Sequence, residues 1–165
     1  MNCNIDVIAR KFYAASNNVF SNTRGSPELM QLHLQEAYCL PILQYASAAV
    51  CFTQTQLNTM NACWNNVYRK IFGFNLWNSV KQFICGLGNL DFISLRNLAM
   101  LQMYKSMFKS DNSVVRLLMQ LYSVSDEFRL TCVKLEINRP ISMLRNNSRH
   151  DIKQYIYDMF SVHLV

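Results

Sequence analysis

The chain has 165 residues, of which 51% are hydrophobic and 12% aromatic, so it can bury a core and does not have the composition of a disordered segment. Glycine (4) and proline (3) are scarce, which disfavours an all-β fold because its turns need such residues every few positions. The net charge of +6 suits a polyanionic partner, nucleic acid before membrane, since the basic residues are spread out; a merely soluble basic surface is the alternative.

The first third of the chain is predicted to be helical. Apolar residues at helical spacing predict a helix over 6–20. Ser26 and Pro27 then predict a second helix, with Ser26 as the N-cap and Pro27 at the first helical position. Pro41 must kink or break that helix, and the apolar piece over 42–50 is expected to lie in the interior.

The clearest helical pattern follows a cap at Thr53 or Thr55. Its apolar residues step by three and four positions: Leu57, Met60, Trp64, Val67 and Ile71. Gly73 is expected to end this helix in a left-handed conformation. A short helix over 79–85 then stops at a glycine pair.

Asp91 is expected to cap a longer helix through residue 107. The predicted polar face of that helix carries Gln102, Lys105, Ser106 and Lys109. Beyond it the sequence predicts a helix over 114–122, a helix or an edge strand over 126–137, a polar loop over 139–149 and a helix over 151–160.

We therefore predict an all-α fold, an irregular helical bundle of about six to eight helices, with one short strand pair after residue 125 as the alternative at that place. The predicted domains are a helical domain over 1–124 and a C-terminal helical extension over 125–165. Asp6 and Arg10 interrupt any N-terminal apolar run, and no stretch reaches the length of about 20 apolar residues that a membrane span needs. We expect an intracellular protein, nuclear or cytoplasmic, that is not secreted and has no membrane partner.

The sequence offers no set of residues for an active site. Its six cysteines lack C-x-x-C spacing, which is typical of reduced, buried thiols and not of a zinc site or a disulfide scaffold. The adjacent acids Asp126 and Glu127 stand where a helix start would place them, so capping is the better interpretation than metal binding. No nucleophile signature accompanies the histidines His33, His150 and His163. We expect no catalytic residue, no metal site and no cofactor.

Basic residues beside aromatic ones are the remaining candidates for function. Such positions can hold phosphates along a duplex without reading its sequence, although a solvated helix face is the simpler interpretation. The candidate nucleic-acid-binding residues are Arg10, Lys11, Arg69, Lys70, Lys81, Lys105 and Lys109.

Several segments, taken in order, resemble the region that follows the catalytic palm in reverse transcriptases of LINE-type (non-LTR) retrotransposons. The similar segments are Arg10–Asn17 (RKFYAASN), Tyr38–Ala46 (YCLPILQYA), Trp64–Phe74 (WNNVYRKIFGF), Ser79–Gly88 (SVKQFICGLG) and Leu90–Ser106. The second resembles the family's leucine-proline-x-leucine-x-tyrosine helix, with Tyr45-Ala46 where the family has tyrosine-glycine. The match is carried by the shared order and spacing over about residues 5–120, and it is poor beyond Ser125.

The resemblance implies the thumb and post-thumb helices of an RNA-directed DNA polymerase, which grip the template–primer duplex. The family's catalytic Ala-Asp-Asp belongs to the palm, and this sequence contains neither that motif nor Tyr-x-Asp-Asp. We therefore expect a non-catalytic fragment that binds RNA or an RNA–DNA duplex weakly and non-specifically, with the upstream palm and fingers as a further partner. The alternative is a helical protein-interaction or self-associating module left from a truncated retroelement, with no nucleic-acid role. A free-standing enzyme is the third and least favoured reading.

Overall fold

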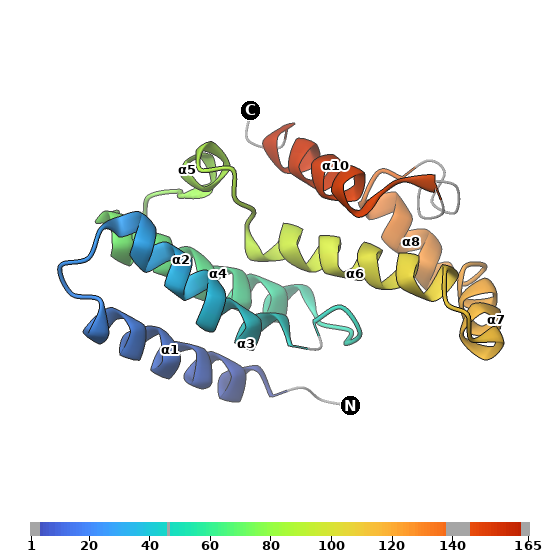
Figure 1. Ribbon diagram of the computed structural model, residues 1–165, viewed down its shortest axis with the longest axis horizontal. Helices are drawn as coiled ribbons and strands as arrows, with labels where there is room; N and C mark the ends of the chain where they lie inside the picture. The colour runs from blue at the N-terminus through green and yellow to red at the C-terminus, as the bar shows by residue number, and fades with distance from the viewer. Residues whose placement is uncertain (1–3, 46, 138–145, 163–165) are drawn as a thin grey trace. The chain divides into compact units, whose positions relative to one another are not determined.

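The computed structural model describes residues 4–45, 47–137 and 146–162, and every regular element within these ranges is a helix (Figure 1). The predicted all-α fold is confirmed. The alternative of a strand over 126–137 is wrong, because α8 (Asp126–Lys134) occupies most of that segment. The predicted loop over 139–149 lies largely outside the described residues.

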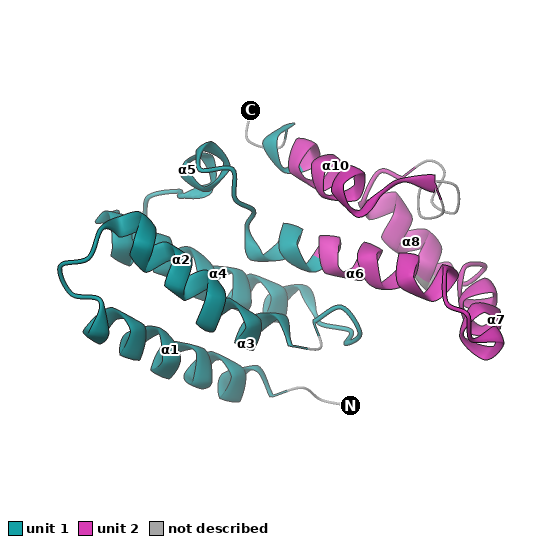
Figure 2. Ribbon diagram, in the orientation of Figure 1, with its two compact units in different colours: residues 1–96, 160–165 teal, residues 97–159 magenta. Residues whose placement is uncertain are grey.

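The chain divides into two compact units, which Figure 2 colours separately. The first comprises residues 1–96 with 160–165, and the second comprises residues 97–159. The division falls within α6 (Phe92–Phe108), whose first residues belong to the first unit and the rest to the second. The domain boundary predicted at residue 124 therefore lies inside the second unit.

In the first unit, four helices pack on one another: α1 (Ile5–Asn22), α2 (Glu28–Tyr38), α3 (Leu40–Gln44) and α4 (Gln54–Phe72). The short helix α5 (Lys81–Gly86) follows. The largest side chains buried in this unit are Phe12, Leu43, Met60, Trp64, Tyr68, Ile84 and Phe92. Three of them lie on α4, so the apolar stripe recognised in the sequence is the centre of this core.

Both ends of α4 follow from local chemistry. Thr53 is the cap: its hydroxyl accepts from the Gln56 amide at 3.3 Å, and the Gln56 side chain accepts from the Thr53 amide at 2.9 Å, which forms a capping box. Gly73 ends the helix at φ 69°, in the left-handed region that a residue without Cβ enters most readily. The predicted stop at Gly73 is confirmed, and of the two predicted caps Thr53 is the correct one.

Two local predictions in this unit were wrong. Ser26 does not cap α2 with its side chain; Pro27 is the N-cap, and the Ser26 carbonyl accepts from the Gln31 side chain at 2.8 Å. The piece over 42–50 is not buried throughout, because α3 ends at Gln44 and the extended backbone of Tyr45 leaves that side chain 84% exposed. The predicted break at Pro41 is confirmed, since α2 ends at Tyr38 and α3 begins at Leu40.

The second unit contains α7 (Ser113–Tyr122), α8, most of α6 and most of α10 (Arg149–Val162). Tyr104, Tyr122 and Phe128 join α6, α7 and α8, with ring centroids 5.5 to 5.8 Å apart. The Tyr155 hydroxyl of α10 donates to the Leu135 carbonyl at 2.7 Å. Aromatic contacts, buried aliphatic side chains such as Leu101, Met119 and Ile152, and polar contacts such as this one thus stabilise the smaller unit.

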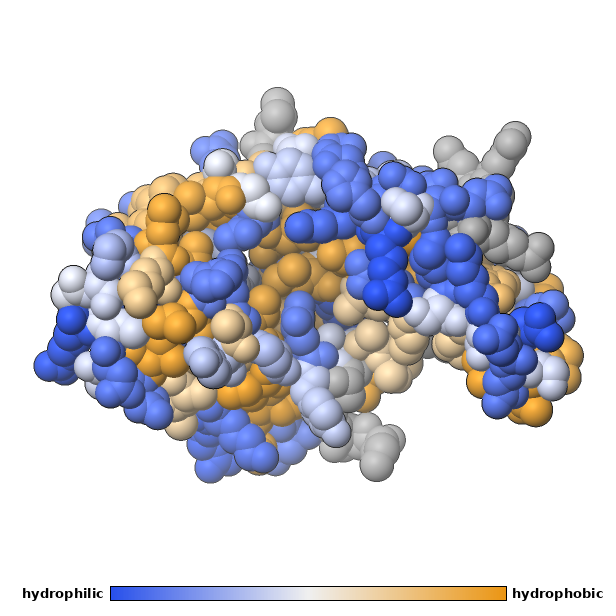
Figure 3. All heavy atoms as spheres, in the orientation of Figure 1, coloured by the Kyte–Doolittle hydropathy of each residue, from blue (hydrophilic) through white to orange (hydrophobic). Residues whose placement is uncertain are grey.

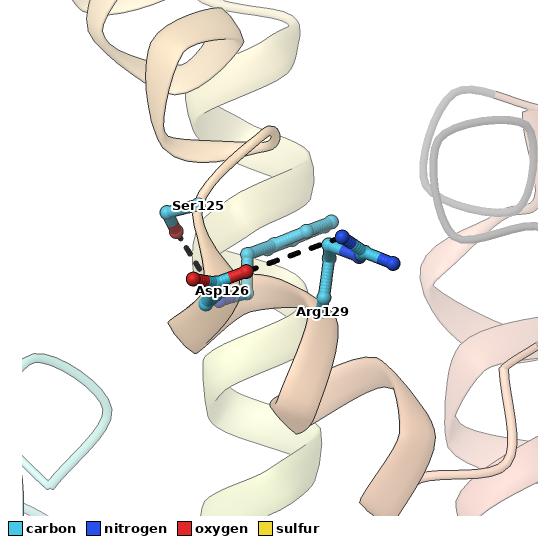
Figure 4. Close-up of polar contacts among 4 residues, drawn as sticks. Ser125, Asp126 and Arg129 are labelled. Carbon is cyan, nitrogen blue, oxygen red and sulfur yellow. Dashed lines mark hydrogen bonds and ion pairs between the residues drawn. The ribbon is translucent and has the colours of Figure 1, made fainter.

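The adjacent acids Asp126 and Glu127 belong to the first turn of α8, as the sequence predicts. Ser125 is the N-cap, and its hydroxyl accepts from the Phe128 amide at 3.2 Å (Figure 4). Asp126 follows in the first turn, and its Oδ1 lies 4.0 Å from Nη1 of Arg129, with both side chains largely exposed. An exposed pair of this kind contributes little stability, so Asp126 acts here as a residue of the helix start.

Three described cysteines are buried thiols, Cys39, Cys63 and Cys132, and burial raises the pKa of each. Cys51 is exposed, which differs from the expectation of buried thiols. Across the described ranges, no helix combines the length and the apolar character that crossing a bilayer requires.

Candidate nucleic-acid interface

The helices α1 and α4 meet along a polar seam. The side-chain Nδ2 of Asn66 donates to the Tyr13 hydroxyl at 3.2 Å, and one turn further along both helices the Lys70 ammonium donates to the side-chain Oδ1 of Asn17 at 3.0 Å. Because both partners advance by four residues, the two helices run in the same direction here, as Figure 1 shows. We call Tyr13, Asn17, Asn66, Arg69 and Lys70 the basic seam.

Arg69 is held in place by neutral acceptors. Its Nη1 donates to Asn66 Oδ1 at 2.9 Å, and its Nε and Nη2 donate to the Asn78 carbonyl at 3.3 and 3.2 Å. A guanidinium carries five N–H donors, so two remain for a further acceptor. The side chain is therefore preoriented while its full charge and part of its donor capacity stay available.

Lys70 is also placed without a counter-charge. Its ammonium bonds to Asn17 and lies 4.2 Å from the centre of the Phe20 ring, at cation–π distance. Neither this residue nor Arg69 forms an ion pair with a carboxylate in the part of the chain that the structure describes. Both cations lie in the last turn of α4, where the negative end of the helix dipole favours them. This interaction with the dipole does not neutralise their charge.

The sequence around the seam contains no acid. From residue 37 to residue 90 there is neither aspartate nor glutamate, while Arg69, Lys70 and Lys81 lie within that run. Tyr13 adds no negative charge either: burial first, and then its hydrogen bond with Cys63, raise the pKa of its phenol above the ordinary value. Arg69 and Lys70 thus carry their positive charge in a stretch of sequence without acids, and the Glu36 carboxylate of α2 lies near Tyr68, the residue before Arg69.

The other predicted nucleic-acid-binding residues of the first unit, Arg10, Lys11 and Lys81, lie outside the basic seam. Arg10 is exposed one turn before Tyr13 on the same face of α1, and its Nε donates to the Asp6 carbonyl at 3.3 Å. Lys11 is exposed on α1 but is rotated by about 100° from that face. Lys81 is exposed at the start of α5, whose Phe83 packs against Phe72 and Phe74 beyond the end of α4.

The structure corrects the prediction for Lys105. The predicted polar face of α6 included it, but the residue is only 7% exposed and its ammonium donates to the Asn147 carbonyl. Desolvation lowers its pKa, and the nearby charge of Lys109 acts in the same direction. Lys105 follows the buried Leu101 by four residues and Tyr104 by one, so it lies on the buried side of α6.

Lys109 is exposed in the second unit, one turn after Lys105. The structure thus gathers Arg69 and Lys70 with Arg10 along one face, leaves Lys11 and Lys81 exposed outside the seam, and turns Lys105 inward. Sequence reasoning missed Asn17 and Asn66, which position the two cations, although the acid-free run was readable from the sequence. It also missed Trp77, whose ring is 95% exposed in the loop after α4.

Among the described residues, no three of the histidines, cysteines, aspartates and glutamates lie close enough together to hold a metal ion. The basic seam offers positive charge and N–H donors from Arg69 and Lys70. Comparison of the chain with protein-family models, with curated proteins and with solved structures finds no match.

Proposed function

We propose that this chain is the non-catalytic, thumb-like and C-terminal helical portion of a LINE-type reverse transcriptase, and that it binds RNA or an RNA–DNA duplex through the phosphate backbone. The observation that carries the proposal is the basic seam: Arg69 and Lys70 are oriented by neutral partners within an acid-free run of 54 residues, from 37 to 90. The family resemblance of the same segments supports it. On this proposal catalysis belongs to an upstream palm, which is also the chain's natural protein partner.

Phosphates are the ligands that such a face suits best. A guanidinium with two remaining N–H donors can hold two phosphate oxygens, and an ammonium placed one residue away can contact the next phosphate. Consecutive phosphates of one strand lie several ångströms apart, a spacing that the long side chains of two consecutive helical residues can span. Contacts of this kind position a duplex without reading its bases.

The test compares two charge-matched double variants. Arg10→Gln with Lys70→Gln removes two cations from the face of the seam, whereas Arg24→Gln with Lys153→Gln removes two exposed cations elsewhere. If Arg10 and Lys70 each contact one phosphate, the first variant should reduce the slope of log affinity against log salt by about 1.8 and weaken binding roughly 10- to 100-fold at about 0.1 M salt. Fluorescence anisotropy with a labelled RNA–DNA duplex measures both quantities.

The control variant should change affinity by less than about threefold, because non-specific long-range charge is the only term it alters. Equal losses in the two variants would mean that net charge alone attracts the duplex and that the seam is not the site. Affinity of the unaltered chain that does not fall as salt is added would rule out phosphate neutralisation altogether.

A second candidate function rests on α7. Val114, Leu117, Leu118 and Leu121 recur at helical spacing and are each at least 55% exposed, and Figure 3 shows apolar residues at the surface of this helix. Such a stripe is the usual mark of a helix that packs on a partner. On this alternative the chain is a self-associating or protein-interaction module, and sedimentation as a stable monomer would contradict the self-associating form.

A further inference from the structure

The loop between α4 and α5 presents an indole ring to solvent. The two tryptophans of the chain have opposite environments, since Trp64 is 1% exposed in the core and Trp77 is 95% exposed. Tryptophan is among the most buried residue types on average, and a ring with almost its whole surface in water loses the hydrophobic stabilisation that burial would supply. The exposed face of the Trp77 ring is therefore apolar surface that a ligand could cover.

The backbone of the loop is anchored on both sides of Trp77. Phe74 is anchored through its amide, which donates to the Arg69 carbonyl at 3.0 Å, and through its ring, 5.0 Å from Phe83. After Trp77 the Asn78 amide closes a turn onto the Asn75 carbonyl at 3.1 Å, and the Asn78 carbonyl accepts the two bonds from Arg69. An anchored backbone on both sides of the ring lowers the entropy cost of binding.

The same bonds couple the ring to the basic seam. Arg69 donates to the carbonyl of Asn78, the residue directly after Trp77, so the guanidinium and the indole belong to one local structure. Lys81 lies exposed four residues after the ring, and the acid-free run includes the whole loop. A cation that binds phosphate beside an exposed aromatic ring is the combination that binds single-stranded nucleic acid.

A protein partner fits this loop less well than a nucleobase does. Stable protein interfaces bury about 800 Å² on each side around a cluster of apolar residues. Here only Leu76, 73% exposed, accompanies the ring, and the remaining exposed neighbours Asn75, Asn78 and Ser79 are polar. One flat ring in a polar, cationic surrounding matches the area and the chemistry of one unpaired base.

We infer that Trp77 stacks on an unpaired base of a nucleic-acid strand whose adjoining phosphates bind Arg69 and Lys70. The inference rests on the proposed function in one respect, namely that the seam binds phosphates. It adds a single-stranded subsite at the end of the duplex-binding face, and it makes the indole ring a determinant of preference for a strand overhang over a blunt end.

The experiment compares Trp77→Ala, Trp77→Phe and Leu76→Ala on a blunt RNA–DNA duplex and on the same duplex with a single-stranded overhang. Trp77→Ala should weaken overhang binding about 5- to 150-fold, the range that one stacked base contributes, and leave blunt-duplex binding within about twofold. The slope of log affinity against log salt should not change, because stacking releases no counterions. Trp77→Phe should retain most of the affinity, and Leu76→Ala should behave like the unaltered chain.

A second readout uses the ring itself. Overhang binding should quench tryptophan emission in the unaltered chain and not in Trp77→Phe, since Trp64 is buried and cannot meet the base. All three variants alter exposed side chains, and their circular dichroism should match that of the unaltered chain.

The outcomes separate this inference from the proposed function. Duplex binding with the expected salt dependence, but no quenching and no loss in Trp77→Ala, overturns the stacking inference and leaves the duplex proposal standing. Overhang binding that depends on Trp77 without measurable blunt-duplex binding supports stacking and contradicts the duplex proposal. If neither nucleic acid binds, both the inference and the duplex proposal are wrong. If Trp77→Ala and Leu76→Ala alike reduce self-association, the ring docks on protein and the inference is wrong.

Discussion

The backbone at Gly73 directs the chain from the end of α4 into the loop that carries Trp77. Its φ of 69° lies in the left-handed region, and a Cβ added there would meet no atom within 4 Å. Any cost of a side chain at this position is therefore conformational and not steric. A substitution at Gly73 therefore tests the conformational cost of ending α4 there, without a steric clash.

Replacing Gly73 by alanine should lower the free energy of unfolding by about 1 kcal/mol, because alanine enters the left-handed region at a cost that glycine does not have. Gly86→Ala is the matched control. Gly86 lies in α5 without a positive φ and also has open space around its Cα, so alanine there should be neutral or slightly stabilising. Urea denaturation measures both, and equal effects would contradict the assignment of the cost to φ.

The surroundings of a charged side chain, and not its residue type, decide whether it is exposed or buried. Arg69 and Lys105 both lie on helices that carry apolar and polar residues. Arg69 keeps two N–H donors for a further acceptor, whereas Lys105 is buried and donates to the Asn147 carbonyl. The spacing of Lys105 from Leu101 was readable in the sequence, but its carbonyl partner lies 42 residues away. A local pattern cannot supply that partner.

At the scale of the element, α7 has two apolar faces. Met119 is buried and Val115 and Tyr122 are half-buried on one side, while the exposed stripe lies on the other. The sequence predicted the helix from its apolar spacing but could not tell which of the two apolar faces the unit would cover. The helix needs only one of them for its own packing, which leaves the other available to a partner.

Replacing Leu117 and Leu121 by glutamine should therefore reduce self-association, if α7 is its basis. The matched control replaces Leu29 and Met30, two exposed apolar residues of α2, by glutamine and should leave self-association unchanged. Analytical ultracentrifugation over a range of concentrations distinguishes the variants. Equal reductions in both would indicate general hydrophobicity and not a site on α7.

At the scale of the whole molecule, buried phenols make stability depend on alkaline pH. Burial raises the pKa of Tyr68 far above its ordinary value of about 10, and Glu36 nearby acts in the same direction. Between the unfolded and folded pKa values the folded chain binds the extra proton, so its stability is complete below pH 10 and falls as pH rises further. Burial raises the pKa of Tyr13 and Tyr155 as well, which gives both units the same trend.

The free energy of unfolding should accordingly lose about 1.4 kcal/mol per pH unit above pH 10 through Tyr68, whose pKa is raised the most. Tyr68→Phe removes this phenol, together with the hydrogen bond from the Asn89 side chain at 3.2 Å. The variant should be less stable at pH 7 and show a shallower alkaline decline. Urea titrations from pH 7 to pH 11 check this, and identical slopes in the two proteins would contradict it.

The sequence by itself determined the fold class, the positions of most helices and several of their ends, such as Gly73 and Asp91, and it narrowed the cap of α4 to Thr53 or Thr55. These features depend on hydrogen bonds and apolar spacing within a few residues, so a local reading reaches them. The tertiary structure alone decided the pairing of Tyr13 with Asn66 and of Asn17 with Lys70, the burial of Lys105 and the exposure of Trp77. Each of the two pairings joins residues 53 positions apart, and burial is a property of the packed helices together, which no local pattern contains.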